Sequence, residues 1–159
     1  MTVSVTDEQS HPVATRRLQA VAEHVLAAED VPSDMQLTLL LVDEAAIAEL
    51  NRAHLGGDEP TDVLAFPIDA PGESGEDVPA MLGDVALCPA VAQRQAPHDP
   101  TGELEMLVVH GILHLLGHDH AEPDERRVMF ARTDELLAEL GAGREARPFS
   151  RAEVREEGS

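Results

Sequence analysis

The sequence contains no tryptophan and no tyrosine, and it has one cysteine and three phenylalanines. A disulfide needs two thiols and a cysteine-type structural zinc site needs several, so Cys88 alone can form neither within the chain. With so few aromatic rings, the base-stacking platforms of many single-strand nucleic-acid binders are nearly excluded, and the core must be aliphatic. A reducing compartment is compatible with this composition.

Long hydrophobic runs are also missing. The N-terminus lacks a basic region followed by an apolar stretch, and no later segment reaches the length of a membrane-spanning helix. We therefore expect a cytoplasmic protein that has no membrane partner, and we expect no organic cofactor.

The charge has one dominant sign. Against 31 acidic residues stand 11 basic ones, all of them arginine, and the formal net charge is −20 at pH 7. Nucleic-acid binding ordinarily depends on basic side chains that neutralise phosphates, so the charge alone argues against such a partner. Because physiological salt screens charges beyond about 8 Å, local features near a site would still decide whether RNA binds there.

Hydrophobic periodicity predicts interleaved strands and helices. The strands are expected at 2–6, 35–42, 61–67 and 82–88, and the helices at 13–28, 43–54, 89–95, 101–116 and 123–140. This order implies an α/β (α+β) fold, with a mixed, mostly parallel sheet of about four strands and about five helices. We expect one layered domain over 1–143 and a disordered tail over 144–159.

The stretch His-Gly-Ile-Leu-His-Leu-Leu-Gly-His-Asp-His, which begins at His110, contains four of the eight histidines. His110 and His114 are four residues apart, so they share one face of a helix. Gly117 is suited to the left-handed conformation that ends a helix, which would direct His118 or His120 toward the same point. Three converging imidazoles predict a metal site.

This site is expected on a central helix, because apolar residues surround most of the circumference over 101–116. Three protein ligands with an open fourth position are typical of catalytic zinc, whereas structural sites are usually closed by four. Zinc lowers the pKa of bound water to about 7, which favours hydrolysis at neutral pH. Nickel or another divalent ion remains an alternative, because imidazole does not select zinc strongly.

The histidine spacing fits metzincin metalloproteases, whose pattern is His-x-x-x-His-x-x-Gly-x-x-His, and the architecture is expected to be zincin-like. Proteases of that class have a glutamate directly after the first histidine as general base. Gly111 occupies that position here. A metallopeptidase is therefore disfavoured.

A second pattern is closer. The sequence His110-Gly-x-Leu-His114-Leu-x-Gly-x-Asp119-His120 resembles the signature of the YbeY family, the bacterial rRNA-maturation endoribonucleases. Pro-Thr-Asp-Val-Leu-Ala-Phe-Pro at 60–67 resembles the family's Pro-Thr-Asp-Val-Leu-Ser-Phe-Pro, and Leu-Gly-Asp-Val-Ala-Leu-Cys at 82–88 resembles its Leu-Gly-Asp-Ile-x-Ile-Cys/Ser. The three blocks also occur in the family's order.

The resemblance implies that His110, His114 and His120 hold one zinc-type ion per chain. His118 would line the site, and Asp119 would hold the turn or orient a ligand histidine. The family also implies cleavage of single-stranded RNA, maturation of the 3′ end of small-subunit rRNA, ribosome quality control, and contact with the ribosome or its small-subunit proteins. The nucleophile is either water on the metal or the RNA 2′-hydroxyl.

One departure concerns phosphate binding. Many family members have an arginine four residues after the asparagine of a Leu-Asn block, where it could neutralise charge on a phosphate. Leu55 stands at that position here, and Arg52 and Arg94 are candidate substitutes. His54 is a further candidate for contact with RNA, although a surface role is commoner for all three. The missing arginine and the acidity favour an alternative function, a ribosome assembly factor that acts mainly by binding and has a structural metal.

Overall fold

The structure is a computed structural model that describes residues 2–55, 62–68, 80–118 and 122–141. The expected tail over 144–159 lies outside the described residues, and so do Asp119, His120 and the side chain of His54. The described elements are β1 (Thr2–Glu8), α1 (Thr15–Ala28), β2 (Gln36–Val42), α2 (Glu44–Leu55), β3 (Val63–Pro67), β4 (Met81–Leu87), α3 (Pro89–Gln95), α4 (Pro100–Leu115) and α5 (Pro123–Leu140).

The strands form one sheet in the order β1-β2-β4-β3. The β1–β2 and β2–β4 pairs are parallel, and β3 pairs with β4 in the antiparallel direction. The apolar run of β2 lies inside the sheet, where both of its faces are covered by neighbouring elements. The expected mixed, mostly parallel sheet within an α/β fold is confirmed.

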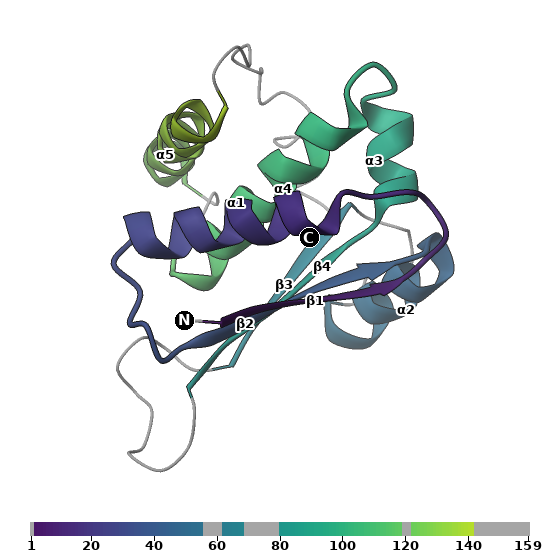
Figure 1. The fold of residues 1–159 in the computed structure, drawn as a ribbon, viewed down its shortest axis with the longest axis horizontal. Helices are drawn as coiled ribbons and strands as arrows, with labels where there is room; N and C mark the ends of the chain where they lie inside the picture. The colour runs from purple at the N-terminus through teal and green to yellow at the C-terminus, as the bar shows by residue number, and fades with distance from the viewer. Residues whose placement is uncertain (1, 56–61, 69–79, 119–121, 142–159) are drawn as a thin grey trace.

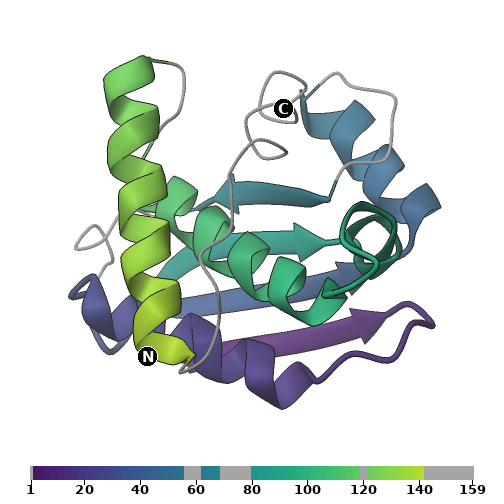
Figure 2. The same cartoon turned by 90° about the horizontal axis from the view of Figure 1, so that it is seen from above.

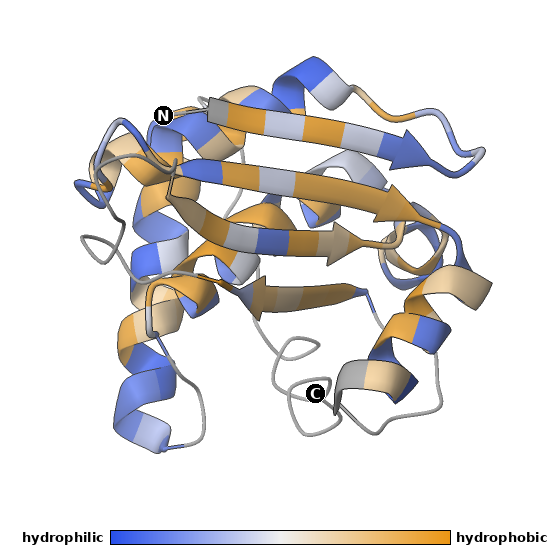
Figure 3. Cartoon of the chain, turned by 90° about the horizontal axis from the view of Figure 1, so that it is seen from below, coloured by the Kyte–Doolittle hydropathy of each residue, from blue (hydrophilic) through white to orange (hydrophobic). Residues whose placement is uncertain are grey.

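The helices cover the two faces of the sheet unequally. Helices α1, α3, α4 and α5 lie on one side and α2 lies on the other (Figure 1). Alternate residues of β2 divide between two cores: Leu39 and Leu41 belong to the large one, and Val42 packs with Ile47 of α2 in the small one. Seen from below, α2 lies across the end of the sheet where β2 and β4 finish (Figure 3).

Helix α4 is the central helix of the large layer. It lies above the sheet between α1, α3 and α5 and contacts all three, as well as β3 and β4 (Figure 2). Residues 102–113 are buried without interruption, as the apolar composition of this segment predicts. Its first turn is capped by Asp99, whose side chain accepts a hydrogen bond from the Gly102 amide at 3.0 Å.

Gly111 allows α4 to lie close to the sheet. A Cβ atom at this position would lie 2.7 Å from Cγ1 of Val85 and 3.4 Å from Cγ2 of Val63. Ordinary carbon contacts need about 3.5–4.0 Å, so a side chain here would force the helix and the sheet apart. The absence of a glutamate at this position thus has a packing cause: its side chain would project into the sheet.

Helix α4 carries a buried carboxylate that is paired with a cation from another helix. Glu105, whose side chain is 3% exposed, pairs with Arg17 of α1 at 3.2 Å. Arg17 also donates a hydrogen bond to the carbonyl oxygen of Leu140 at 3.2 Å, at the end of α5. One guanidinium therefore links three helices around a carboxylate that has almost no contact with solvent.

Among the described residues, no helix combines the length and apolar composition needed to cross a bilayer.

Gly111→Ala should lower the free energy of unfolding. Overpacking a core costs about 1–3 kcal/mol, and the higher helix propensity of alanine returns about 1 kcal/mol, so a net loss of about 1 kcal/mol is expected. Chemical denaturation measures this loss. Val85→Ala removes the clashing methyl groups, so the double variant should be more stable than the sum of the two single changes predicts. Simple additivity would show that the Val85 contact does not limit this position.

Arg17→Met should destabilise the protein by about 2 kcal/mol, because it removes the cation that faces a buried carboxylate. Exchanging Glu105 for glutamine in the same chain should recover part of the loss, since the buried anion is then gone. Thermal unfolding of the single and double variants provides the measurement. Equal melting temperatures for Arg17→Met and the wild type would contradict the assignment of the pair as a stabilising contact.

Candidate metal centre

Helix α4 ends in a Schellman motif. The amide of His118 donates to the carbonyl oxygen of Leu113 at 3.0 Å, and the amide of Gly117 donates to that of His114 at 3.1 Å. Gly117 has φ +102°, which a residue with a side chain rarely adopts. The prediction that Gly117 ends this helix in a positive-φ conformation is confirmed, and the motif turns the chain back beside the last turn.

The turn determines which ring nitrogen of His114 carries the proton. Nδ1 of His114 lies 3.0 Å from the main-chain carbonyl oxygen of His118. A carbonyl oxygen only accepts hydrogen bonds, so Nδ1 is the protonated nitrogen of the neutral ring and donates to it. The lone pair of the neutral ring then lies on Nε2. A metal-ligating histidine typically has this arrangement, in which the other ring nitrogen donates to a carbonyl or a carboxylate.

His110 lies one turn earlier on α4 and is 7% exposed. Its ring faces Phe130 of α5, with the ring centroids 6.0 Å apart and the planes inclined by 41°. The aromatic ring and the surrounding helices restrict the rotamers open to His110. The two α4 histidines therefore differ in environment: His110 is enclosed and His114 is exposed.

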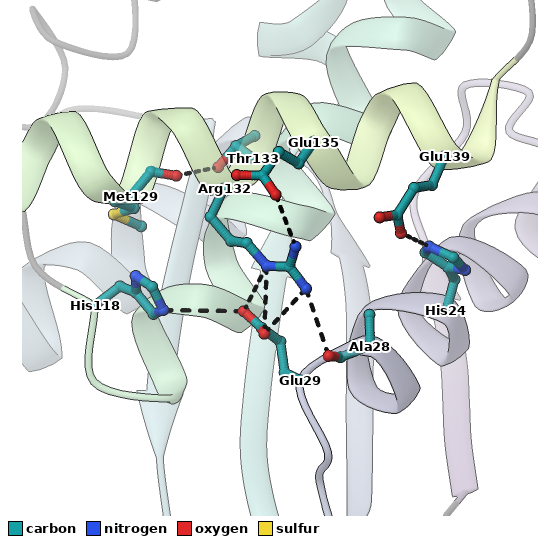
Figure 4. Close-up of polar contacts among 9 residues, drawn as sticks. All are labelled: His24, Ala28, Glu29, His118, Met129, Arg132, Thr133, Glu135 and Glu139. Atoms are coloured by element: carbon teal, nitrogen blue, oxygen red, sulfur yellow. Dashed lines mark hydrogen bonds and ion pairs between the residues drawn. The ribbon is translucent and has the colours of Figure 1, made fainter.

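The side chain of His118 reaches toward the end of α1. Its Nε2 lies 3.9 Å from Oε1 of Glu29 (Figure 4). Glu29 is the C-cap of α1, which also ends in a Schellman motif: Val31 N–H donates to the Leu26 carbonyl oxygen at 3.0 Å, and Asp30 has φ +56°. Two helix ends of the same geometry thus bring Glu29 and His118 together.

Arg132 of α5 holds the Glu29 carboxylate. Its Nε and Nη2 atoms donate to Oε1 and Oε2 of Glu29 at 3.3 Å each, and Nη2 also donates to the Ala28 carbonyl oxygen at 3.4 Å. This bonding to Glu29 raises the pKa of the Arg132 guanidinium above its ordinary value, so the group stays charged. The contact joins α5 to the end of α1.

Two hollows flank the turn after α4. One is lined by Glu29, Asp30, Val31, Leu116 and His118, and the other by Gly117, His118, Asp124, Glu125 and Val128. His118 lines both hollows. Both contain carboxylates, which are suited to cations and to donor groups and unfavourable for phosphates.

The structure separates the predicted histidines from the two predicted arginines. His110, His114 and His118 gather at the C-terminal end of α4, near the start of β4. Arg52 lies on α2, on the opposite face of the sheet (Figure 1), and forms an ion pair with Glu49.

Arg94 ends α3 beside the beginning of α4 and pairs with Glu44 at 2.6 Å. About 15 Å of helix separates that end of α4 from His110. The structure therefore brings neither Arg52 nor Arg94 to the histidines.

The donor atoms fit part of the predicted metal site. Among the described residues no group of three or more His, Cys, Asp and Glu side chains could hold an ion, and the predicted third ligand, His120, is not one of those residues. The Nε2 lone pair of His114 is suited to a divalent cation. Cys88 is not: burial raises the pKa of its thiol, which favours the protonated, poorly coordinating form.

Sequence reasoning missed Glu29, Phe130 and Arg132. Glu29 and Arg132 are separated by 103 residues, so no local pattern connects them. A partial signal was present, because a proline follows shortly after the end of α1, as it does after many helix C-caps. That signal locates the end of α1 but does not identify Arg132 as the cation that Glu29 faces.

Comparison with known proteins places this arrangement in a family. The family model for endoribonuclease YbeY matches residues 4–141. Proteins named endoribonuclease YbeY from Salinispora tropica and a Nocardioides species are 48% and 47% identical over 149 and 144 residues, which cover 87% of this chain and 95% and 97% of those proteins. The solution structure of TM1509 from Thermotoga maritima superposes with a TM-score of 0.59 at 28% identity, covering 99% of this chain and 96% of that one. The chain belongs to the YbeY family of hydrolytic endoribonucleases.

Proposed function

We propose that the protein is a metal-dependent endoribonuclease that cuts single-stranded RNA, with His110, His114 and His120 as the ligands of one zinc ion. Nickel or another divalent ion is a possible substitute, because the donors are imidazoles. The observation that carries this proposal is the hydrogen bond from His114 Nδ1 to the His118 carbonyl oxygen, which leaves Nε2 as the ligating nitrogen. Family membership supplies the reaction class.

The residues of α4 would act by orientation. The enclosed ring of His110 is held by its contact with Phe130, and the ring of His114 is held by the turn. When bound, a divalent ion supplies Lewis-acid stabilisation of the negative charge that develops at the phosphorus centre. Gly111 contributes no base, so this chain has no equivalent of the peptidase glutamate beside the first histidine.

In the cell, we propose maturation of the 3′ end of small-subunit rRNA and ribosome quality control, in the cytoplasm. The three sequence blocks shared with the family support this role. A charge of −20 would favour docking to basic small-subunit ribosomal proteins, because complementary charge increases the rate and specificity of association. The proposed partners are therefore rRNA and these proteins.

One observation favours the second candidate, an assembly factor with a structural metal. Arg52 and Arg94 both face carboxylates, Glu49 and Glu44, which lowers their capacity to clamp a phosphate. In that case chelation of the metal should greatly lower the melting temperature, because binding of a structural metal contributes directly to folding free energy.

His114→Ala should abolish stoichiometric zinc binding and slow RNA cleavage at least about 100-fold, because it removes a ligand at the proposed centre. Metal content by mass spectrometry and cleavage of a labelled single-stranded RNA measure the two effects. His98→Ala, an exposed histidine outside the cluster, is the control and should behave as the wild type. If rRNA processing in cells survives the loss of the metal, the binding role is correct and the catalytic role is wrong.

Binding to naked single-stranded RNA should be weak at physiological ionic strength, whereas the small ribosomal subunit should be bound at least about tenfold more tightly. The reason is the −20 charge, which opposes phosphates but complements basic proteins. Anisotropy titrations with the two targets at equal salt provide the comparison. Tight, sequence-independent binding to naked RNA at physiological ionic strength would contradict the proposal that ribosomal contacts are needed.

A further inference from the structure

One of the two hollows beside the end of α4 is shared between that helix end and the start of α5. It is lined by Gly117, His118, Asp124, Glu125 and Val128. The first turns of α5 extend past the end of α4 (Figure 2), so they form a wall beside the turn that follows His114. The hollow therefore adjoins the histidine cluster and contains none of its predicted ligands.

Val128 gives this hollow an apolar wall. Its side chain is 60% exposed, whereas the next two residues of α5, Met129 and Phe130, are buried in the core. A single exposed valine is ordinary on a protein surface, so its place beside the candidate centre matters more than its exposure. A Cβ atom at Gly117 would meet no heavy atom of the described residues within 4 Å, its neighbours in the chain apart. The space over the turn is therefore free for a ligand that contacts Val128.

The two carboxylates of the hollow differ in availability. Asp124 accepts a hydrogen bond from Arg127 at 2.9 Å. In the part of the chain that the structure describes, no group pairs with the carboxylate of Glu125. Glu125 precedes Val128 by three residues, so the two side chains share one face of α5. Glu125 is thus the carboxylate that is free to accept a hydrogen bond from a ligand in contact with Val128.

Single-stranded RNA carries groups that match both side chains. Its unstacked bases expose flat faces and hydrogen-bonding edges to proteins. A carboxylate accepts a hydrogen bond from the exocyclic amino group of cytosine, and adenine and guanine also carry an amino group. Uracil has no amino group and presents O4 at the same position, where a carboxylate repels it. An apolar wall beside a free carboxylate therefore discriminates among bases.

The same carboxylates oppose the RNA backbone. Asp124 and Glu125 repel phosphates whatever bases these carry, so the repulsion lowers the affinity for every RNA alike. The hydrogen bond from an amino group, in contrast, depends on the base. The net effect of the hollow is selection among RNA sequences and not tighter binding overall.

We propose that Val128 and Glu125 form a subsite for one unpaired base of the RNA substrate, in which Glu125 favours cytosine, adenine and guanine over uracil. The substrate, RNA, rests on the proposed function, which this subsite extends from the reaction to the choice of base. The contacts are made by side chains of α5 and need no metal ion.

Free nucleosides test the subsite itself in the full-length protein. They carry no phosphate, so the acidity of the protein does not oppose their binding. Methyl NMR follows the signals of Val128 during titration with cytidine, with uridine and with 2-pyrimidinone riboside, which lacks both the amino group and O4. Cytidine should bind about fivefold more tightly than 2-pyrimidinone riboside, the ratio that one solvent-accessible hydrogen bond provides. Uridine should bind no better than 2-pyrimidinone riboside.

Variants separate the contributions of the two side chains. Glu125→Gln should bring the ratio of cytidine to uridine affinity near one, because an amide both donates and accepts hydrogen bonds. Val128→Ala should weaken binding of all three nucleosides by a similar factor of about three, the effect of roughly one lost methylene contact. In this variant the Gly117 amide signal reports binding.

Two matched controls address charge. Glu23→Gln removes an exposed carboxylate of α1 that does not line the hollow, and Asp124→Asn removes the second carboxylate of the hollow. Both controls should keep the wild-type ratio of cytidine to uridine affinity.

Cleavage assays test whether the subsite lies on the path of the substrate. Single-stranded RNAs that differ in one base near the cut should be cleaved about fivefold faster with cytosine than with uracil at one fixed position, the ratio expected for the nucleosides. Glu125→Gln should lose this preference and keep the zinc content of the wild type.

Equal affinities of the wild type for cytidine and uridine would overturn the proposal. The same loss of the ratio in Asp124→Asn or Glu23→Gln would also overturn it, since total charge would then set the preference. Base-selective nucleoside binding without a base preference in cleavage would place the hollow outside the substrate path, which contradicts the proposal as well. If the wild type neither binds zinc nor cleaves RNA, the proposed function fails, and the nucleoside titration separately decides whether the hollow selects bases.

Discussion

The close contact of α4 with the sheet is the constraint on which the rest of the structure depends. A glycine at position 111 brings the helix backbone within reach of the Val85 methyl groups, and the helix is then buried on all sides by strands and neighbouring helices. This depth encloses His110 and leaves His114 near the surface at the helix end. It also explains why Glu105 needs a cation from another helix, since water does not reach it.

Most of the fold follows from local patterns that the sequence displays. The period of apolar residues locates every described helix and strand to within two residues at each end, and Asp43 caps α2 by accepting a hydrogen bond from the Ala46 amide at 2.8 Å. The roles of Gly117 and of the pair His110 and His114 were also predictable from the sequence, because turn chemistry and helical spacing act over a few residues. The antiparallel direction of β3 could not be predicted in this way, since strand pairing depends on contacts remote in sequence.

The contacts that organise the candidate site are those that local patterns cannot reveal. Arg17 and Glu105 are 88 residues apart in the sequence, and Arg132 and Glu29 are 103 residues apart. Each of the four is of a residue type that ordinarily lies on the protein surface. Similarly, Arg52 and Arg94 were reasonable phosphate ligands by composition, but the fold gives them carboxylate partners away from the histidines. Only the packing of α1, α4 and α5 determines which charges become neighbours.

The two Schellman motifs have an electrostatic consequence. In each helix the peptide dipoles add to about half a negative charge at the C-terminus, an effect that falls off within the last turn. Helices α1 and α4 both end beside the same turn, where Glu29 contributes a full negative charge that Arg132 offsets. The backbone alone therefore gives this region a negative potential, which attracts a cation and opposes an RNA phosphate until a cation is present. At the proposed metal centre, this potential would favour binding of the ion before binding of the RNA.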